Sequence, residues 1–175
     1  MLIAAVNSGL FKTLLMLHIL SAIIGFGAVF LNGIYAAQIK KAGGVGGLAI
    51  ADANHTVTNI AEKVIYTVPI WGILLVLSSS KLFTFKQTWV MAALGLYIVA
   101  VGVATGLLIP LTKKMRALMA ELVAAGPPPA GASAGGPPPQ VAQLEEMGKR
   151  AAMFGAFLNI ALVVIVYLMV FKPGY

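Results

Sequence analysis

Few side chains in this sequence can do chemistry, and the most informative of them is His18. It lies within a long apolar run, and residues at steps of three and four along that run share its helical face. The members of this face are His18, Ser21, Ala22, Gly25, Val29 and Asn32. Ionisable and amide side chains inside a bilayer are costly and usually turn inward, and small residues let another helix approach closely. We therefore predict that this face points into a helix bundle and that Ser21, Gly25 and Asn32 pack there.

A second polar face opens the next apolar run and comprises His55, Asn59, Glu62 and Tyr66. We interpret it as the solvated start of a helix near the membrane surface, capped by a preceding polar residue. His18 and His55 are expected at opposite edges of the hydrocarbon core, which is about 30 Å thick. This separation argues against one haem shared by both histidines in a single chain. A haem held by His18 alone remains an open alternative.

Other catalytic or metal sites are not indicated. The chain has no cysteine, which excludes thiolate zinc, iron–sulfur clusters and haem attached through thioethers. Two histidines without a carboxylate in the bilayer are too few for a zinc or di-metal site. Met16 lies on a different helical face from His18, so no copper motif is formed. The glycines at 43–47 lack the strand, the lysine and the hydroxyl residue of a phosphate loop. The sequence points away from an enzyme and from a metal centre.

Membrane-spanning helices must position these residues. Of the 175 residues, 60% are hydrophobic and 10% are charged, whereas a soluble domain carries about a quarter charged residues. A bilayer core needs roughly 20 apolar residues in a helix. Four segments meet this requirement, at about 14–37, 60–80, 88–111 and 151–171. We predict an all-α fold, a single polytopic membrane domain of four transmembrane helices in an antiparallel bundle. The first apolar run is too long for a signal peptide and is expected to be retained.

Basic residues set the expected orientation. The first and third connections carry eight Lys and Arg residues, and the opposite side carries four. By the positive-inside rule these two connections face the cytoplasm, and both termini lie outside. All five acidic residues also fall on the inner side, but the rule counts cations and not net charge. The cations stand singly or in pairs between apolar runs, so the net charge of +7 indicates a membrane protein and not a nucleic-acid-binding one.

The third and fourth apolar runs also carry faces of small residues. The expected helix-packing positions are Gly95, Gly102, Gly106, Gly155 and Asn159. Gly102 and Gly106 form a GxxxG pattern, which we interpret as close packing inside one chain, with association between chains as the alternative. Asn32 and Asn159 are candidates for hydrogen bonds between helices, each worth on the order of 1 kcal/mol.

Glycine and proline mark the interruptions. Pro69 is expected to kink the second span and to free a carbonyl near Ile65. The glycines at 43–47 predict a mobile connection, with a helix restarting near Ala49. Residues 111–125 show apolar side chains at spacings of three and four without Gly or Pro, so they predict an amphipathic helix that continues the third span. A second amphipathic stretch precedes the fourth span, and the Pro/Gly/Ala-rich segment 126–139 between them predicts a loop that serves as a spacer. Together these segments predict a cytoplasmic helical hairpin.

Two motifs resemble those of a known family. The segment from Leu17 to Gly27 resembles the opening "LHxxxAxxxxGG" helix of a bacterial four-helix integral membrane protein family of unknown function, and the segment from Val166 to Gly174 resembles its "fLMvxKPg" tail. Phe26 and the proline-rich segment depart from the family pattern. The opening helix is also similar to copper-resistance D-type membrane proteins and, more distantly, to the four-helix bacterial protoporphyrinogen oxidase. In that oxidase a first-helix histidine is linked to haem, so the resemblance implies His18 as a haem ligand. The oxidase's other motif residues are not recognisable here, so its activity is not carried over.

These observations predict a non-catalytic protein of the bacterial inner membrane. The expected role is a small accessory or scaffold subunit of a larger respiratory or photosynthetic assembly, in contact with lipid and with other membrane subunits or a second copy of itself. A haem-b-binding redox protein that uses His18 is the first alternative. A copper-handling or small-solute transport protein is the second.

Overall fold

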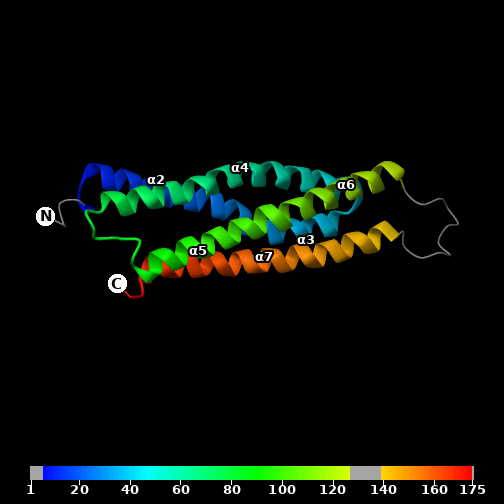
Figure 1. Ribbon diagram of the computed structural model, residues 1–175. Coiled ribbons are helices and arrows are strands. Elements are labelled where there is room, and N and C mark those ends of the chain that lie inside the picture. Colours follow the sequence, from blue (N-terminus) through cyan, green and yellow to red (C-terminus); the bar gives the residue numbers. More distant parts are fainter. Residues whose placement is uncertain (1–5, 127–138, 175) are drawn as a thin grey trace. The chain divides into compact units, whose positions relative to one another are not determined.

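A computed structural model describes residues 6–126 and 139–174, and every element in these ranges is a helix (Figure 1). The helices are α2 (Gly9–Phe30), α3 (Asn32–Ala42), α4 (Gly44–Ser78), α5 (Thr88–Val103), the π-helix η1 (Ala104–Leu108), α6 (Ile109–Ala125) and α7 (Pro139–Phe171). They form four helical stretches that are long and apolar enough to cross a membrane, namely Gly9–Ala42, Gly44–Ser78, Thr88–Ala125 and Pro139–Phe171. The all-α, four-span architecture is therefore confirmed, whereas the antiparallel order of the whole bundle stays a prediction. The proline-rich loop lies almost entirely outside the described residues.

Most apolar side chains of these stretches face outward. Only 6–17% of the residues in the most apolar part of each stretch are buried, and large side chains such as Ile23, Leu77 and Ile160 are more than half exposed. A soluble monomer rarely exposes apolar surface of this extent. The exposure fits helices whose solvent is the hydrocarbon of a bilayer.

The chain falls into two compact units, which are described separately. Unit 1 comprises Met1–Leu31, Val57–Ala100 and Ile160–Tyr175, and unit 2 comprises Asn32–Thr56 and Val101–Asn159. The buried core of unit 1 gathers near the start of α2. Phe11, Leu14 and Leu75 form a cluster, against which Val6, Trp71 and Phe83 pack.

In unit 1 the first helix starts earlier than the apolar run suggests. Residue 14 marks the expected start of the span, but α2 begins at Gly9. The Ser8 side chain accepts a hydrogen bond from Phe11 N (3.2 Å), which satisfies a backbone donor that has no partner within the helix. A helix begins where its first N–H groups are capped, and a hydropathy pattern does not report that position.

The connection between α4 and α5, also in unit 1, is organised by Ser79. This side chain is fully buried. Its Oγ lies 2.7 Å from the Val76 carbonyl and accepts a hydrogen bond from Phe83 N (3.0 Å). Ser80 and Lys81 take positive φ values of 50° and 68° to complete the turn. Ser79 therefore fixes the turn that joins the two helices.

In unit 2 the glycine-rich connection is shorter than the sequence suggests. The expectation of a mobile segment with a helix restarting near Ala49 is wrong, because α4 begins at Gly44, directly after α3 and Gly43. Gly43 and Gly44 have φ values of +59° and +45°, which side-chain-bearing residues rarely adopt. A Cβ at Gly47 would lie 2.8 Å from the Ile39 carbonyl oxygen. The glycines thus allow a tight turn with a close approach between two helices, and not a flexible loop.

The amphipathic segments of unit 2 are helical, as expected. α6 runs to Ala125, and α7 starts at Pro139 and continues into the fourth apolar run without a break. A Cβ at Gly148 would lie 3.9 Å from Met115 Cε, so α6 and α7 face each other at these residues. Met147 beside this contact is buried.

The π-helix η1 interrupts the third stretch just before Pro110. The N–H of Ile109 donates to the Ala104 carbonyl, five residues back. Pro110 carries no N–H. The carbonyl that would face it, Gly106 O in α-helical register or Thr105 O in π register, therefore receives no hydrogen bond from it. Such insertions are frequent at functional positions of helices.

Candidate functional site

His18 lies in unit 1 and is held by the backbone of α4. Its Nδ1 is 3.0 Å from the Val68 carbonyl oxygen. A carbonyl has no hydrogen to give, so Nδ1 must carry the proton, and in the neutral ring Nε2 keeps its lone pair. The ring also lies against Gly72, where a Cβ would approach His18 Cε1 to 3.2 Å. The arrangement orients the imidazole and leaves Nε2 as its basic nitrogen.

The other residues of the His18 face also pack against α4, and we call this contact between α2 and α4 the polar seam. Thr67 Oγ1 donates to the Val64 carbonyl (2.8 Å) and lies 3.2 Å from Ser21 Oγ. Gly25 is buried, and a Cβ there would lie 2.7 Å from Ile65 Cγ1 and 3.1 Å from Ile65 N. Residue numbers rise along α2 and fall along α4 at these contacts. Ser21 and Gly25 thus lie where α2 and α4 touch.

The carbonyl that Pro69 leaves without a backbone donor accepts a hydrogen bond from a side chain of a third helix. Pro69 cannot donate to the carbonyl four residues earlier, which is that of Ile65. The Tyr97 hydroxyl from α5 donates to this oxygen at 3.1 Å. The sequence indicates the freed carbonyl but not the donor, because a tyrosine in an apolar run gives no sign of which helix it will face. Tyr97 and Thr67 are the members of this polar seam that sequence reasoning missed.

The other predicted packing residues lie in more open surroundings. Among the described residues, no atom comes within 4 Å of a Cβ built at Gly95, Gly102, Gly106 or Gly155, leaving aside each residue's chain neighbours and its own helix backbone. Gly102 and Gly106 are exposed. Asn32 has an interaction partner, and Asn159 is half-buried in α7. The packing roles of these residues stay predictions.

The polar face at the start of the second apolar run lies within α4. His55, Asn59 and Glu62 each have an interaction partner, and Tyr66 is 42% exposed. In unit 2, Asp52 lies 3.5 Å from Arg116 of α6, with both side chains partly exposed. An ion pair of this exposure contributes about 0–1 kcal/mol. It joins two helices without forming a reactive centre.

The chemistry available to this seam is that of one oriented imidazole among hydroxyl groups and carbonyls. Within residues 6–126 and 139–174, no group of three or more His, Cys, Asp or Glu side chains is placed to hold a metal ion. His18 can supply a single ligand through Nε2. The seam can also hold three helices together through hydrogen bonds that lipid cannot replace.

Comparison with known proteins identifies a family. Residues 12–173 match the model of a family described as "Predicted integral membrane protein (DUF2269)". Neither a curated protein nor a solved structure matches the chain. The match supports an uncharacterised membrane family, whereas the similarity to copper-resistance D-type proteins and the bacterial source stay predictions.

Proposed function

This chain belongs to the DUF2269 family of predicted integral membrane proteins, and from that premise we propose that it acts as a non-catalytic accessory subunit. Its partners are other subunits of a bacterial inner-membrane assembly, respiratory or photosynthetic, or a second copy of itself. The function is lateral association, in which a transmembrane helix of the partner packs against an open glycine face of the third helical stretch.

The open surface at Gly102 and Gly106 carries this proposal. Both glycines are exposed, and nothing in the described chain approaches the positions of their missing side chains. Leu107 beside them is 50% exposed. In a bilayer the hydrophobic effect does not drive helices together, so close approach at small residues supplies the packing energy. A GxxxG pair that stays open in the described chain is free to provide this contact to a partner.

The π-helix at the same position supports the proposal independently. Pro110 leaves one carbonyl of η1 without its usual backbone donor, and an unsatisfied carbonyl in hydrocarbon costs several kcal/mol. Thr105 Oγ1 donates to the Val101 carbonyl (2.8 Å), so its hydrogen is already used. A polar side chain of a docked helix would satisfy the remaining oxygen.

The proposal is tested by purification of the full-length protein from native membranes in mild detergent. In the Gly102→Ile/Gly106→Ile variant, the affinity for co-purifying subunits or for a second copy of the chain should fall by about five- to thirtyfold. This fall is equivalent to roughly 1–2 kcal/mol of association free energy. Gly27→Ile is the matched control, because Gly27 is also exposed and has no atom within 4 Å of its Cβ position. Equal retention of partners by both variants, or a wild-type protein that purifies as a lone monomer, would count against the proposal.

A second candidate, a haem-b-binding redox protein, is favoured by the geometry of His18. Ligating histidines almost always donate their other ring N–H to a carbonyl or carboxylate, which fixes the ring and raises its basicity. The Val68 carbonyl does this for His18, so His18 would hold a haem iron through Nε2. A bound haem would supply one-electron chemistry.

An absorption spectrum of the purified protein discriminates the two candidates. A near-stoichiometric Soret band that disappears in His18→Ala, and persists in the Ser21→Ala control, would support the haem candidate. A colourless protein with a stoichiometric partner would support the accessory-subunit proposal. The copper-handling or solute-transport alternative has no observation in its favour, and metal uptake into proteoliposomes tests it.

A further inference from the structure

The contact between α6 and α7 in unit 2 brings the ends of two apolar runs to one level. The third apolar run ends near Leu111, and the fourth begins near Ala151. Met115 and Gly148 face each other across the two helices, four residues beyond the first edge and three residues before the second. At 1.5 Å per residue the two edges therefore differ in depth by only about 1–2 Å.

Basic side chains gather at this level. Lys113 and Lys114 lie about 3–5 Å beyond the edge at Leu111, and Lys149 lies about 3 Å before Ala151, taking 1.5 Å per helical residue. All three side chains are exposed. Long lysine side chains at helix ends extend toward the headgroup region of the bilayer. Their ammonium groups are thus expected at the depth of the lipid phosphates.

The neighbouring acidic residues form no ion pair with these three lysines in the described part of the chain. Asp52 is paired with Arg116 (3.5 Å), and Glu146 is paired with Arg150 (3.2 Å). Glu145 and Glu146 lie roughly 8–9 Å before Ala151, and Glu121 lies about 15 Å beyond Leu111, so the carboxylates stand farther from the apolar edges than the lysines. Within the ranges that the structure describes, Lys113, Lys114 and Lys149 form no ion pair.

We propose that Lys113, Lys114 and Lys149 form a binding surface for the phosphate groups of anionic phospholipids. This lysine surface recognises a phosphodiester in the bilayer through charge and depth together. Lysine suits the task because its ammonium is a compact point charge on a flexible stem, which follows a mobile headgroup. Lipids whose headgroups carry a net negative charge, such as phosphatidylglycerol and cardiolipin, therefore bind in preference to phosphatidylcholine, whose phosphate is offset by its own ammonium group. The inference does not depend on the accessory-subunit proposal, since the glycine face and the lysine surface use different residues.

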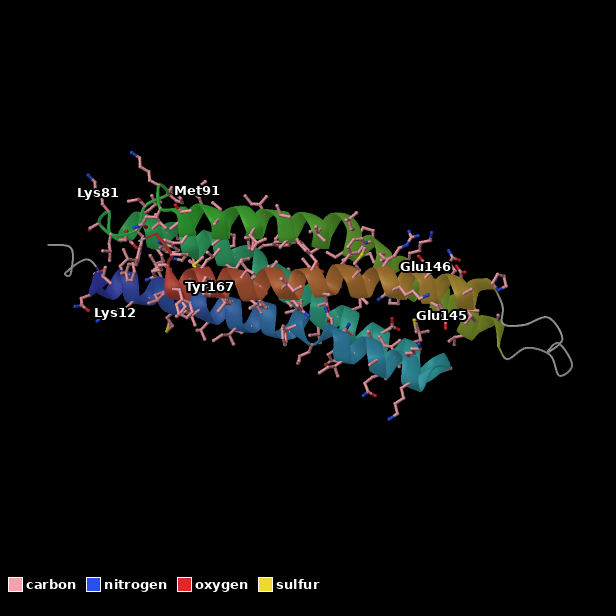
Figure 2. The ribbon with its side chains drawn as sticks, turned by 90° about the horizontal axis from the view of Figure 1, so that it is seen from below. Lys12, Lys81, Met91, Glu145, Glu146 and Tyr167 are labelled. Atoms are coloured by element: carbon pink, nitrogen blue, oxygen red, sulfur yellow. The ribbon has the colours of Figure 1, made fainter. Side chains whose placement is uncertain are left out.

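The test uses the full-length protein in detergent, titrated with phosphatidylglycerol, cardiolipin or phosphatidylcholine, with binding measured by native mass spectrometry. The Lys113→Gln/Lys114→Gln/Lys149→Gln variant should lose about fivefold in affinity per lysine, and so about a hundredfold for the anionic lipids. Lys12→Gln/Lys81→Gln/Lys86→Gln is the matched control. It removes the same charge from exposed lysines of unit 1, where Lys12 and Lys81 lie at one end of that unit (Figure 2). The control lysines stand just as close to predicted apolar edges, so unchanged binding of anionic lipid by this variant would assign the site to the three lysines beside the α6–α7 contact and not to charge and depth alone.

Three results would overturn the proposal. The first is equal affinity of the wild type for phosphatidylcholine and phosphatidylglycerol. The second is an equal loss of affinity in the control variant, which would mean that only net charge matters. The third is displacement of the lipid by millimolar glycerol phosphate, which would indicate a site for a free anion. If the triple variant does not fold, the three single Lys→Gln variants replace it, and an unchanged affinity in all three also overturns the proposal.

Discussion

We predict that Tyr97 offsets the hydrogen bond that Pro69 removes from α4. Pro69 removes the N–H that would pair with the Ile65 carbonyl, and the Tyr97 hydroxyl donates to that oxygen at 3.1 Å. Tyr97→Phe removes the donor and changes little else in the shape of the side chain. A buried acceptor left without a partner costs about 1–3 kcal/mol. Hydrogen bonds between membrane helices average nearer 0.6 kcal/mol, so we expect Tyr97→Phe to lower the free energy of unfolding by about 1–2 kcal/mol.

A double-mutant cycle with Pro69→Ala separates this effect from general packing. Alanine at position 69 restores an N–H four residues after Ile65, which can donate to the same carbonyl. The cost of Tyr97→Phe should therefore fall by about 0.5–1 kcal/mol in the Pro69→Ala background, which is a coupling typical of residues that share a partner. The assay is unfolding of the purified protein in mixed micelles, followed by circular dichroism. Tyr66→Phe is the control, because Tyr66 is 42% exposed. An equal cost of Tyr97→Phe in both backgrounds would refute the reasoning.

Two further substitutions test contacts within unit 1. Gly25→Ala places a methyl group 2.7 Å from Ile65 Cγ1. The resulting strain of about 1–3 kcal/mol should outweigh the gain of about 1 kcal/mol in helix propensity, so the thermal midpoint of unfolding should fall. Gly27→Ala, with no described atom within 4 Å of its Cβ, should instead leave the thermal midpoint unchanged or raise it; a lower midpoint for Gly27→Ala than for Gly25→Ala would contradict the packing at Gly25. Lys172 Nζ lies 4.6 Å from the centre of the Phe83 ring, and Lys172→Met should cost about 0.5–1 kcal/mol of unfolding free energy. Thermal unfolding measures this loss against the exposed control Lys86→Met, and an equal effect of both substitutions would argue against a cation–π contact.

Pro69 and the His18 face show which features of the site could be predicted from the sequence and which could not. Pro69 indicated a free carbonyl near Ile65 without any structure, because the missing N–H is a property of proline itself. The spacing of His18, Ser21 and Gly25 placed them on one face, since helical periodicity is local. The partners of that face, Val68 and Thr67, lie about fifty residues away in the chain. Periodicity within one helix carries no information on the register of the next.

The sequence by itself determined that the chain is all-helical and has four stretches able to span a membrane. The long apolar runs must satisfy their backbone N–H and C=O groups within the protein, because lipid offers no hydrogen-bond partner. Helices do so within each segment. The tertiary structure decided where helices begin and which side chains meet. The Ser8 side chain caps Phe11 N at the start of α2. The glycines at 43–47 form a tight turn in place of the expected loop. The Tyr97 hydroxyl donates a hydrogen bond to the Ile65 carbonyl that Pro69 leaves without its backbone donor. The turn depends on the φ values of single residues, and the Tyr97 contact depends on a distance between groups far apart along the chain. The Ser8 cap is a hydrogen bond between residues three apart. Hydropathy and periodicity encode none of these.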